Sequence, residues 1–361
     1  MNFISLIMAV FSLLGALDRI LGGKLGLAKE FEKGLQLYGS LALSMIGMVV
    51  ISPLIADALE PAFGFVHRAL GIDPSVIPAS LFANDMGGAP LATQVAADPK
   101  VGRFNALVVS SMMGCTISFT IPCALGAVNE RRRELLLGLL CGIATIPLGC
   151  FAGGLVLGLS AAAVVKNLLP LAAFSAVIAV GLALCPDVCV KLFSAFGALI
   201  RVVITAGLGL SLFTFLTGVE LVPGLGTLEE GAALVLNACA VMTGAFPLLY
   251  VLSKLLDRPM KALGAKLGVN ETSVMGFVSS LANSITTFEM MENMDRRGAM
   301  LNAAFSVSAA FVLADHLAFT LAFDAACLPA VIAGKLSAGL LAALVAAMLS
   351  KKMITEREVS Q

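Results

Sequence analysis

Apolar runs of about 20 residues follow one another along almost the whole chain, separated only by short polar joints. A helix of that length crosses a hydrocarbon core about 30 Å thick. Only 13% of the residues are charged, against about 25% in soluble domains. Because a bilayer offers backbone groups no water to bond, helices are the favoured spanning structure. The sequence therefore predicts an all-α, polytopic integral membrane protein that forms a single domain over residues 1–361.

Several classes of function are disfavoured by what the sequence lacks. The net charge is zero, whereas a nucleic-acid partner requires a basic footprint. No H-E-x-x-H, G-x-S-x-G or G-x-x-x-x-G-K-[ST] motif supports an enzyme or an ATP-driven pump. The eight cysteines lie in or beside apolar runs and complete no metal-ligand set, so we interpret them as packing residues. We therefore expect a protein that is not an enzyme and binds no cofactor or metal.

Two parts of the chain resemble each other at a separation of about 197 residues, which suggests an internal repeat. Gly71 aligns with Gly268, and Ser80–Asp85 (SLFAND) resembles Ser279–Ser284 (SSLANS). Internal repeats are common in secondary transporters. The boundaries that we predict are about 1–160 for repeat 1, about 161–187 for a linking helix and about 188–352 for repeat 2.

The basic residues orient the two repeats, because short cytoplasmic loops are rich in Lys and Arg. The joint from Lys24 to Lys33 is basic, whereas its counterpart at 219–231 is acidic, so matching joints lie on opposite sides and the repeats are inverted. Arg131–Arg133 falls inside only if segments 76–97 and 271–294 enter the membrane and return on the same side. We therefore predict about nine transmembrane helices plus two re-entrant hairpins, with an uncleaved first span, the N-terminus outside and the C-terminus inside. The expected spans are 2–21, 35–58, 103–128, 134–160, 167–185, 188–218, 230–253, 298–326 and 328–350.

Each predicted hairpin turns at residues that suit an irregular backbone. Gly87, Gly88 and Pro90 supply the first turn, whereas the second has hydroxyl side chains, including Ser284 and Thr287, that can bond freed backbone groups. Such backbone is tolerated at membrane depth only where protein or a water-filled cavity satisfies it. Two turns that meet near the midplane would offer helix ends to a solute. The sequence therefore predicts the binding site of a secondary transporter that works by alternating access.

Carboxylates inside a membrane persist mainly where they are paired or line a pathway. The candidates are Asp85 at the first turn, Glu289 after the second, and Asp315 with its neighbour His316 in the predicted span 298–326. We expect Arg201 to be the one basic residue at comparable depth. This excess of acid favours a cationic solute whose ammonium group meets Asp85 or Asp315.

Structural roles remain open for each of these groups. Asp85 could cap a half-helix, and Asp315 could form a structural pair with Arg201. Glu289 lies close to the basic joint at residues 296–297 and could form an interfacial ion pair there. His316 points about 100° away from Asp315 on a helix, so we expect one of the two to line the site and the other to stand behind it. His316 could also carry a proton.

Amide and hydroxyl side chains would bind the uncharged end of the solute. The candidates are Asn84, Asn283, Ser284 and Thr287. Asn283 could instead be a hydrogen-bonding strut between helices. Two more amides, Asn105 and Asn302, occupy equivalent positions in the repeats, and we rank a structural role for them, bonding the adjacent hairpin, above direct contact with the solute.

A series of short motifs, in order and at consistent spacing, resembles the bacterial ethanolamine permease family of ethanolamine-utilisation operons over essentially the whole chain. Singly they are weak, because Gly, Ala and Met are common in membrane helices. The motifs are Asp85–Gly88 (DMGG), Ser111–Gly114 (SMMG), Thr145–Cys150 (TIPLGC), Leu281–Asn283 (LAN), Met294–Gly298 (MDRRG) and Phe305–Phe311 (FSVSAAF) followed by Asp315 and His316.

The resemblance implies transport of ethanolamine, a small amino alcohol that is mostly cationic at neutral pH, across the bacterial cytoplasmic membrane to supply ethanolamine catabolism. Glu289 stands where we expect a small residue in that family, which leaves a shifted substrate preference open. The alternatives are a carrier of the same fold for another small amine or amino acid, with or without coupling to H⁺ or Na⁺, and an intramembrane enzyme or sensor. Membrane lipid is the expected surrounding, and a homo-oligomer is left open.

Overall fold

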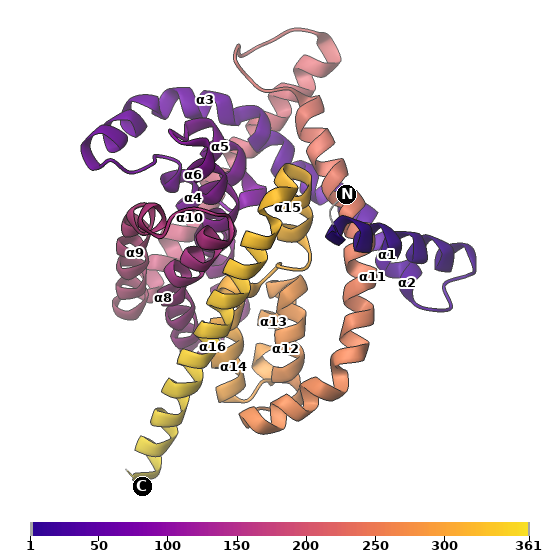
Figure 1. The fold of residues 1–361 in the computed structure, drawn as a ribbon, viewed down its shortest axis with the longest axis vertical. Helices are drawn as coiled ribbons and strands as arrows, with labels where there is room; N and C mark the ends of the chain where they lie inside the picture. Colours follow the sequence, from indigo (N-terminus) through magenta and orange to yellow (C-terminus); the bar gives the residue numbers. More distant parts are fainter. Residues whose placement is uncertain (1–2, 360–361) are drawn as a thin grey trace.

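The structure is a computed structural model that describes residues 3–359, and these residues form helices and no strand (Figure 1). The all-α fold class predicted from the sequence is confirmed. The longer helices are α1 (Phe3–Ile20), α2 (Leu27–Gln36), α3 (Tyr38–Leu70), α8 (Arg132–Val156), α9 (Ala161–Leu184), α10 (Pro186–Thr217), α11 (Leu228–Leu267), α12 (Glu271–Ala282), α14 (Arg296–Ala309), α15 (Asp315–Asp324) and α16 (Leu328–Val359). The shorter helices are α4 (Val76–Leu81), η1 (Asn84–Met86), α5 (Gly88–Val95), α6 (Pro99–Phe104), η2 (Asn105–Gly114), η3 (Thr116–Thr120), α7 (Ile121–Ala127), α13 (Ser284–Glu289), η4 (Met291–Asn293) and η5 (Ala325–Cys327).

Eight segments of the described chain are helical, long and apolar enough to cross a membrane, so the protein is a polytopic membrane protein. Their positions match the predicted spans along most of the chain, and α15 and α16 together form the last segment. Two expected polar joints are helical instead. The joint at 59–75 is mostly the end of α3, which runs on to Leu70, and the joint at 254–270 is mostly the end of α11, which runs on to Leu267.

The predicted span 298–326 is not one continuous helix, and that prediction is wrong. α14 ends at Ala309, the chain turns through residues 310–314, and α15 begins at Asp315 (Figure 1). Phe311 has a φ of 63°, a left-handed conformation that a bulky residue rarely adopts. The N–H groups of Phe311 and Leu313 donate to carbonyls of Ser280 and Leu281 at the end of α12, at 3.0 Å each. These bonds to a neighbouring helix replace the bonds that a continuous helix would make.

Hydrogen bonds and ion pairs between loops define one end of the helical bundle. Arg132 pairs with Asp187 at 2.5 Å, Arg296 with Glu134 at 3.7 Å, and Glu292 accepts the N–H groups of residues 129 and 130. Exposed ion pairs contribute little to stability, but they show which loops are neighbours. These loops are the ones that the distribution of basic residues places inside, and Figure 1 shows the C-terminus at the same lower end.

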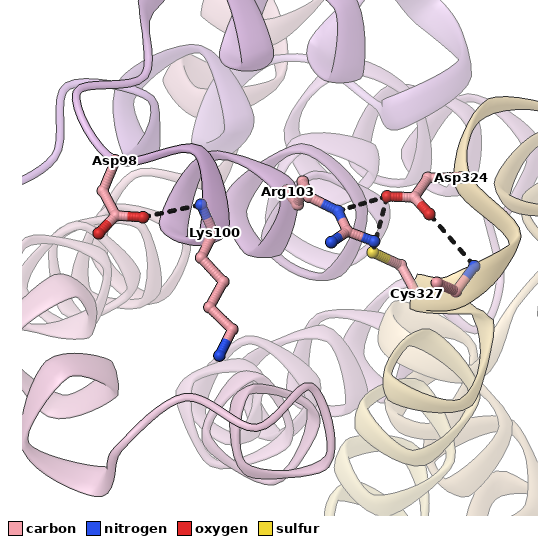
Figure 2. A network of polar contacts seen from close by, with 6 residues as sticks. Asp98, Lys100, Arg103, Asp324 and Cys327 are labelled. Atoms are coloured by element: carbon pink, nitrogen blue, oxygen red, sulfur yellow. Dashed lines mark hydrogen bonds and ion pairs between the residues drawn. The ribbon is translucent and has the colours of Figure 1, made fainter.

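A second network defines the opposite end (Figure 2). Arg103 pairs with Asp324 at 2.5 Å, and the same carboxylate accepts from the thiol of Cys327. Lys100 donates to the carbonyl of Gly158 at 3.2 Å. Figure 1 shows the connection between α10 and α11 at this upper end. All of these loops belong to the side that the sequence predicts to be outside.

The segments predicted to be re-entrant are helical hairpins whose two ends lie together. In the first, the carboxylate of Asp73 accepts the N–H of Ser75 at the entry and the N–H groups of Ala97 and Asp98 at the exit, at 2.8–3.1 Å. In the second, Asp295 at the exit accepts the N–H of Asn270 at the entry, at 2.8 Å. The first hairpin starts at the upper end of the bundle and the second at the lower end.

Asp73→Ala is expected to lower the free energy of unfolding by about 2–3 kcal/mol, because it removes the acceptor of three backbone N–H groups and of the Ser75 hydroxyl. The thermal unfolding midpoint of the purified protein in detergent measures the effect. Asp57→Ala is the matched control, because Asp57 is exposed and accepts no hydrogen bond in the described structure. Equal midpoints for the two variants would show that Asp73 does not hold the hairpin closed.

Glycines on α8 allow three elements to pack closely in the core. A Cβ atom on Gly138 or Gly142 would collide with α14, and one on Gly149 or Gly153 would collide with α16. Small residues spaced four apart let membrane helices approach closely. Beside this bundle runs the continuous helical stretch of η2 and η3, which is π-helical over most of residues 105–120 and buried from 105 to 118.

Candidate functional site

A cavity of about 270 Å³ lies where the break of the first hairpin meets α3, η2–η3 and the turn between α14 and α15. It could hold roughly nine water molecules at about 30 Å³ each. Its wall contains Asp85, Asp315 and His316, which come from segments far apart in the sequence. Cavities lined by apolar side chains with a few convergent polar groups are typical ligand sites.

Asp85 reaches the cavity because the first hairpin is broken just before it. α4 ends at Leu81, and the freed carbonyl of Phe82 accepts from the hydroxyl of Ser110 at 2.6 Å, while the N–H of Ala83 donates to Ser118 at 3.1 Å. Gly87 follows with a φ of 98°, a conformation that favours glycine. Two serines of the buried π-helical stretch thus satisfy the broken backbone and fix the position of Asp85.

Asp315 and His316 begin α15, immediately after the turn at 310–314, and both line the cavity. We expected one of the two to stand behind the other, whereas both are part of the cavity wall. An acidic residue in the first turn of a helix interacts favourably with the helix dipole. Within the described residues, no side chain donates a hydrogen bond to the carboxylate of Asp315, and the Nδ1 atom of His316 has no partner.

Aromatic and hydroxyl side chains complete the wall. Phe119 and Phe311 meet edge to face, with ring centroids 5.6 Å apart. The hydroxyl groups of Ser40 and Ser44 of α3 donate to backbone carbonyls three or four residues earlier, which leaves their oxygens free to accept. The cavity therefore combines two carboxylates, aromatic faces and hydroxyl oxygens, a set suited to a small cation with a polar tail.

Four predicted contact residues lie outside this wall. Asn84 is completely buried, and neither its amide oxygen nor its nitrogen has a partner within the described structure. Asn283 caps α13 by accepting the N–H of Ile285 at 2.8 Å. Thr287 donates to the carbonyl of Gly276 at 3.1 Å, and the buried hydroxyl of Ser284 has no partner.

Asn105 and Asn302 each bond to the start of the hairpin that precedes them. Asn105 donates to the hydroxyl of Ser75 at 2.8 Å, and Asn302 donates to the carbonyl of Ser273 at 2.8 Å. Asn105 and Asn167 also exchange hydrogen bonds through their amides. The bonds to Ser75 and Ser273 are of the kind that we ranked first for Asn105 and Asn302, namely structural bonds to the adjacent hairpin. Glu289, by contrast, is exposed and does not line the cavity.

The expected distribution of buried bases is wrong in two respects. Arg201 is exposed on α10, a helix that contributes no residue to the cavity wall, and it forms no ion pair with Asp315 among the described residues. Lys335 of α16, which the sequence reasoning missed, is 1% exposed and donates to the carbonyl of Ser111 at 2.7 Å. The sequence feature that could have indicated Lys335 is its position as a lone charged residue in the middle of an otherwise apolar run.

Sequence reasoning also missed the serines and aromatic residues of the wall. Ser40 and Ser44 are four residues apart and so share one face of α3, a weak signal that the predicted span 35–58 already contained. Cys115 lines the cavity from the junction of η2 and η3. Phe311 lines it because of its unusual backbone, for which no glycine or proline gives a signal.

Comparison with known proteins identifies the family. The family model described as "Ethanolamine utilisation protein, EutH" matches residues 1–349. The chain belongs to the EutH family. The match includes both hairpins and every residue of the cavity wall.

Individual relatives cover nearly the same length. A protein of Listeria monocytogenes named probable ethanolamine permease EutH is 41% identical, over 98% of this chain and 95% of that protein. A protein of the same name from Salmonella typhimurium is 37% identical over 92% of this chain and 91% of its own length. The uncharacterized protein YxeR of Bacillus subtilis is 39% identical over 91% of this chain and 89% of its own.

No solved structure matches this chain. With the family established and eight apolar helices long enough to span a membrane, the protein is a multi-pass integral protein of the bacterial inner membrane. The names of two of these relatives, probable ethanolamine permease EutH, indicate a transporter family.

Proposed function

We propose that this protein transports ethanolamine across the cytoplasmic membrane by alternating access and binds it in the cavity that contains Asp85 and Asp315. The observation that carries the proposal is that two carboxylates from distant parts of the chain share one small cavity at the breaks of two helical segments. Placing two acids together in a membrane protein is costly unless a cation binds between them. The names of the relatives support the same substrate.

In this proposal the ammonium group of ethanolamine lies against Asp85 and Asp315, close to the aromatic faces of Phe119 and Phe311. The hydroxyl group bonds to Ser40 or Ser44 of α3. We further propose that the chain contains two inverted repeats, at about 1–160 and about 188–352, and that the two hairpins are equivalent segments of them. Support comes from the hydrogen bonds that join the entry and exit of each hairpin, since these bonds lie at opposite ends of the bundle.

A carrier of the same fold for an amino acid is the alternative, and the wall of the cavity disfavours it. A carboxylate on the solute would require a basic partner, and none of the residues that line this cavity is Lys or Arg. A histidine is present, but its neighbours in the wall are two acids. A small amine other than ethanolamine, such as choline, stays compatible with the charges.

Uptake of radiolabelled ethanolamine into proteoliposomes tests the proposal, with protein-free liposomes as the control. We expect uptake that saturates and that excess unlabelled ethanolamine abolishes, whereas glycine or serine at the same concentration leaves it unchanged. Choline, which carries three additional methyl groups, is expected to compete poorly. Uptake of an amino acid or of choline in preference to ethanolamine would contradict the proposed substrate.

A further inference from the structure

Lys335 is a buried cation to which nothing above assigns a function. It lies eight residues into α16, it is 1% exposed, and its ammonium group donates to the carbonyl of Ser111 at 2.7 Å. Its neighbour Gly334 packs closely against α8, because a Cβ atom there would lie 3.0 Å from the carbonyl oxygen of Gly149. A lysine at such depth is costly and is retained mainly where it is paired or acts in transport.

The position of Lys335 connects it to the proposed binding cavity. Its acceptor, Ser111, belongs to η2, and Cys115, four residues further along that stretch, lines the cavity. Ser110, the neighbour of Ser111, donates to the carbonyl of Phe82 at 2.6 Å, so Lys335 and the hairpin break that carries Asp85 are held by adjacent residues of η2. Among the described residues Lys335 forms no direct ion pair with Asp85. The other titratable groups in the wall of the cavity are Asp315 and His316.

A carrier with an acidic binding site holds an uncompensated negative charge when the site is empty. To return without substrate it passes through an occluded state, in which water leaves the cavity and the carboxylate loses its solvation. An unpaired carboxylate in that state is strongly disfavoured. Carriers that are coupled to an ion fill the site with that ion, whereas an uncoupled carrier needs a compensating charge of its own.

We propose that Lys335 is this built-in counter-charge: its fixed ammonium group compensates Asp85 when the cavity is empty, so that the carrier returns without a coupling ion and catalyses uncoupled uniport of its cationic substrate. The inference rests on the proposed function, since it requires a carrier whose substrate binds at Asp85. It also predicts that net uptake by the wild-type protein is the same with and without gradients of Na⁺ or pH when the membrane potential is clamped at zero.

A purely structural role is the competing explanation, because the bond to Ser111 could simply satisfy a carbonyl of the π-helical stretch. Lys335→Gln separates the two roles, since glutamine keeps a hydrogen-bond donor and removes the charge. Lys335→Arg keeps the charge. Lys100→Gln is the matched control, because Lys100 also donates to a backbone carbonyl, that of Gly158, but lies at the end of the bundle (Figure 2).

The decisive experiment compares net uptake with exchange in proteoliposomes. Net uptake of labelled ethanolamine into empty vesicles requires the empty carrier to return, whereas exchange against internal unlabelled ethanolamine does not. For Lys335→Gln we expect net uptake to fall by about tenfold or more and exchange to stay within about twofold of wild type. Lys335→Arg should recover at least half of the net uptake, and Lys100→Gln should change neither rate.

Each outcome is informative. Loss of both net uptake and exchange in Lys335→Gln, in a protein that remains monodisperse with an unchanged thermal midpoint, overturns the inference and leaves a structural role. Unchanged net uptake in Lys335→Gln, or wild-type uptake that requires a Na⁺ or pH gradient, overturns it as well. If the wild-type protein neither takes up nor exchanges ethanolamine, the proposed function itself fails, and that result is distinguishable because it appears before any variant is made.

Discussion

Replacing Asp85 by asparagine is expected to weaken ethanolamine binding by roughly 10- to 100-fold, because a hydrogen bond to a charged group contributes about 1.5–3 kcal/mol. Asparagine has nearly the same shape as aspartate, so the break between α4 and α5 should persist. Asp315→Asn removes the second carboxylate of the cavity and should produce a smaller loss in the same direction. The dissociation constant of the purified protein, measured by calorimetry, is the appropriate quantity.

Binding is a better readout than uptake for this variant, because uptake also depends on the return of the empty carrier, in which Lys335 is proposed to compensate Asp85. Asp57→Asn is the control, since Asp57 is exposed and far along α3 from the cavity. Wild-type affinity in both Asp85→Asn and Asp315→Asn would refute a cationic site in this cavity. A lower thermal midpoint with unchanged affinity in Asp85→Asn would instead assign Asp85 to holding the hairpin turn.

The hairpins and the two acids were predictable because each interrupts an apolar run. Amide, carboxylate, glycine and proline in SLFANDMGGAP are costly in lipid, so their presence indicates a break in the helix. The break occurs as expected, between Leu81 and Gly88. A single acid at membrane depth likewise indicates function, and Asp315 does line the cavity.

The break between α14 and α15 was not predictable, because residues 309–314 contain no glycine or proline. The turn exists because the end of α12 offers two carbonyls that compete for the N–H groups of Phe311 and Leu313. Such competition depends on tertiary contacts that a single sequence does not reveal. Lys335 was not predictable for a different reason: a lone lysine in an apolar run does not show by itself whether its side chain is buried against another helix.

The cavity wall also depends on geometry that hydropathy does not encode. Ser40, Cys115 and Phe311 come from three separate segments, and Asn283, which lies outside the wall, was as good a candidate in the sequence as any of them. The π-helical stretch is central here, since its serines hold the first hairpin and its junction contributes Cys115. Extra residues per turn change which side chains share a face, so spacing rules for an α-helix fail along it.

The same contact between hairpin and π-helical stretch leads to the largest expected loss of stability. A Cβ atom on Gly114 would collide with the carbonyl group of Phe82, 2.5 Å from its carbon atom, and also with the carbonyl oxygen of Ala79. Both obstacles are backbone atoms, so no side-chain rotation relieves them. Gly114→Ala is therefore expected to lower the free energy of unfolding by about 3 kcal/mol, at the upper end of overpacking costs.

Gly126→Ala is the matched control, because Gly126 is also helical and a Cβ atom there meets nothing within 4 Å. Alanine should raise helix propensity at that position, by up to about 1 kcal/mol. Gly114→Ala should therefore lower the thermal midpoint in detergent, while Gly126→Ala keeps or raises it. Since Phe82 is only three residues from Asp85, any folded Gly114→Ala protein should also bind ethanolamine more weakly. Wild-type midpoint and affinity in Gly114→Ala would mean that the hairpin does not pack against η2 as closely as described.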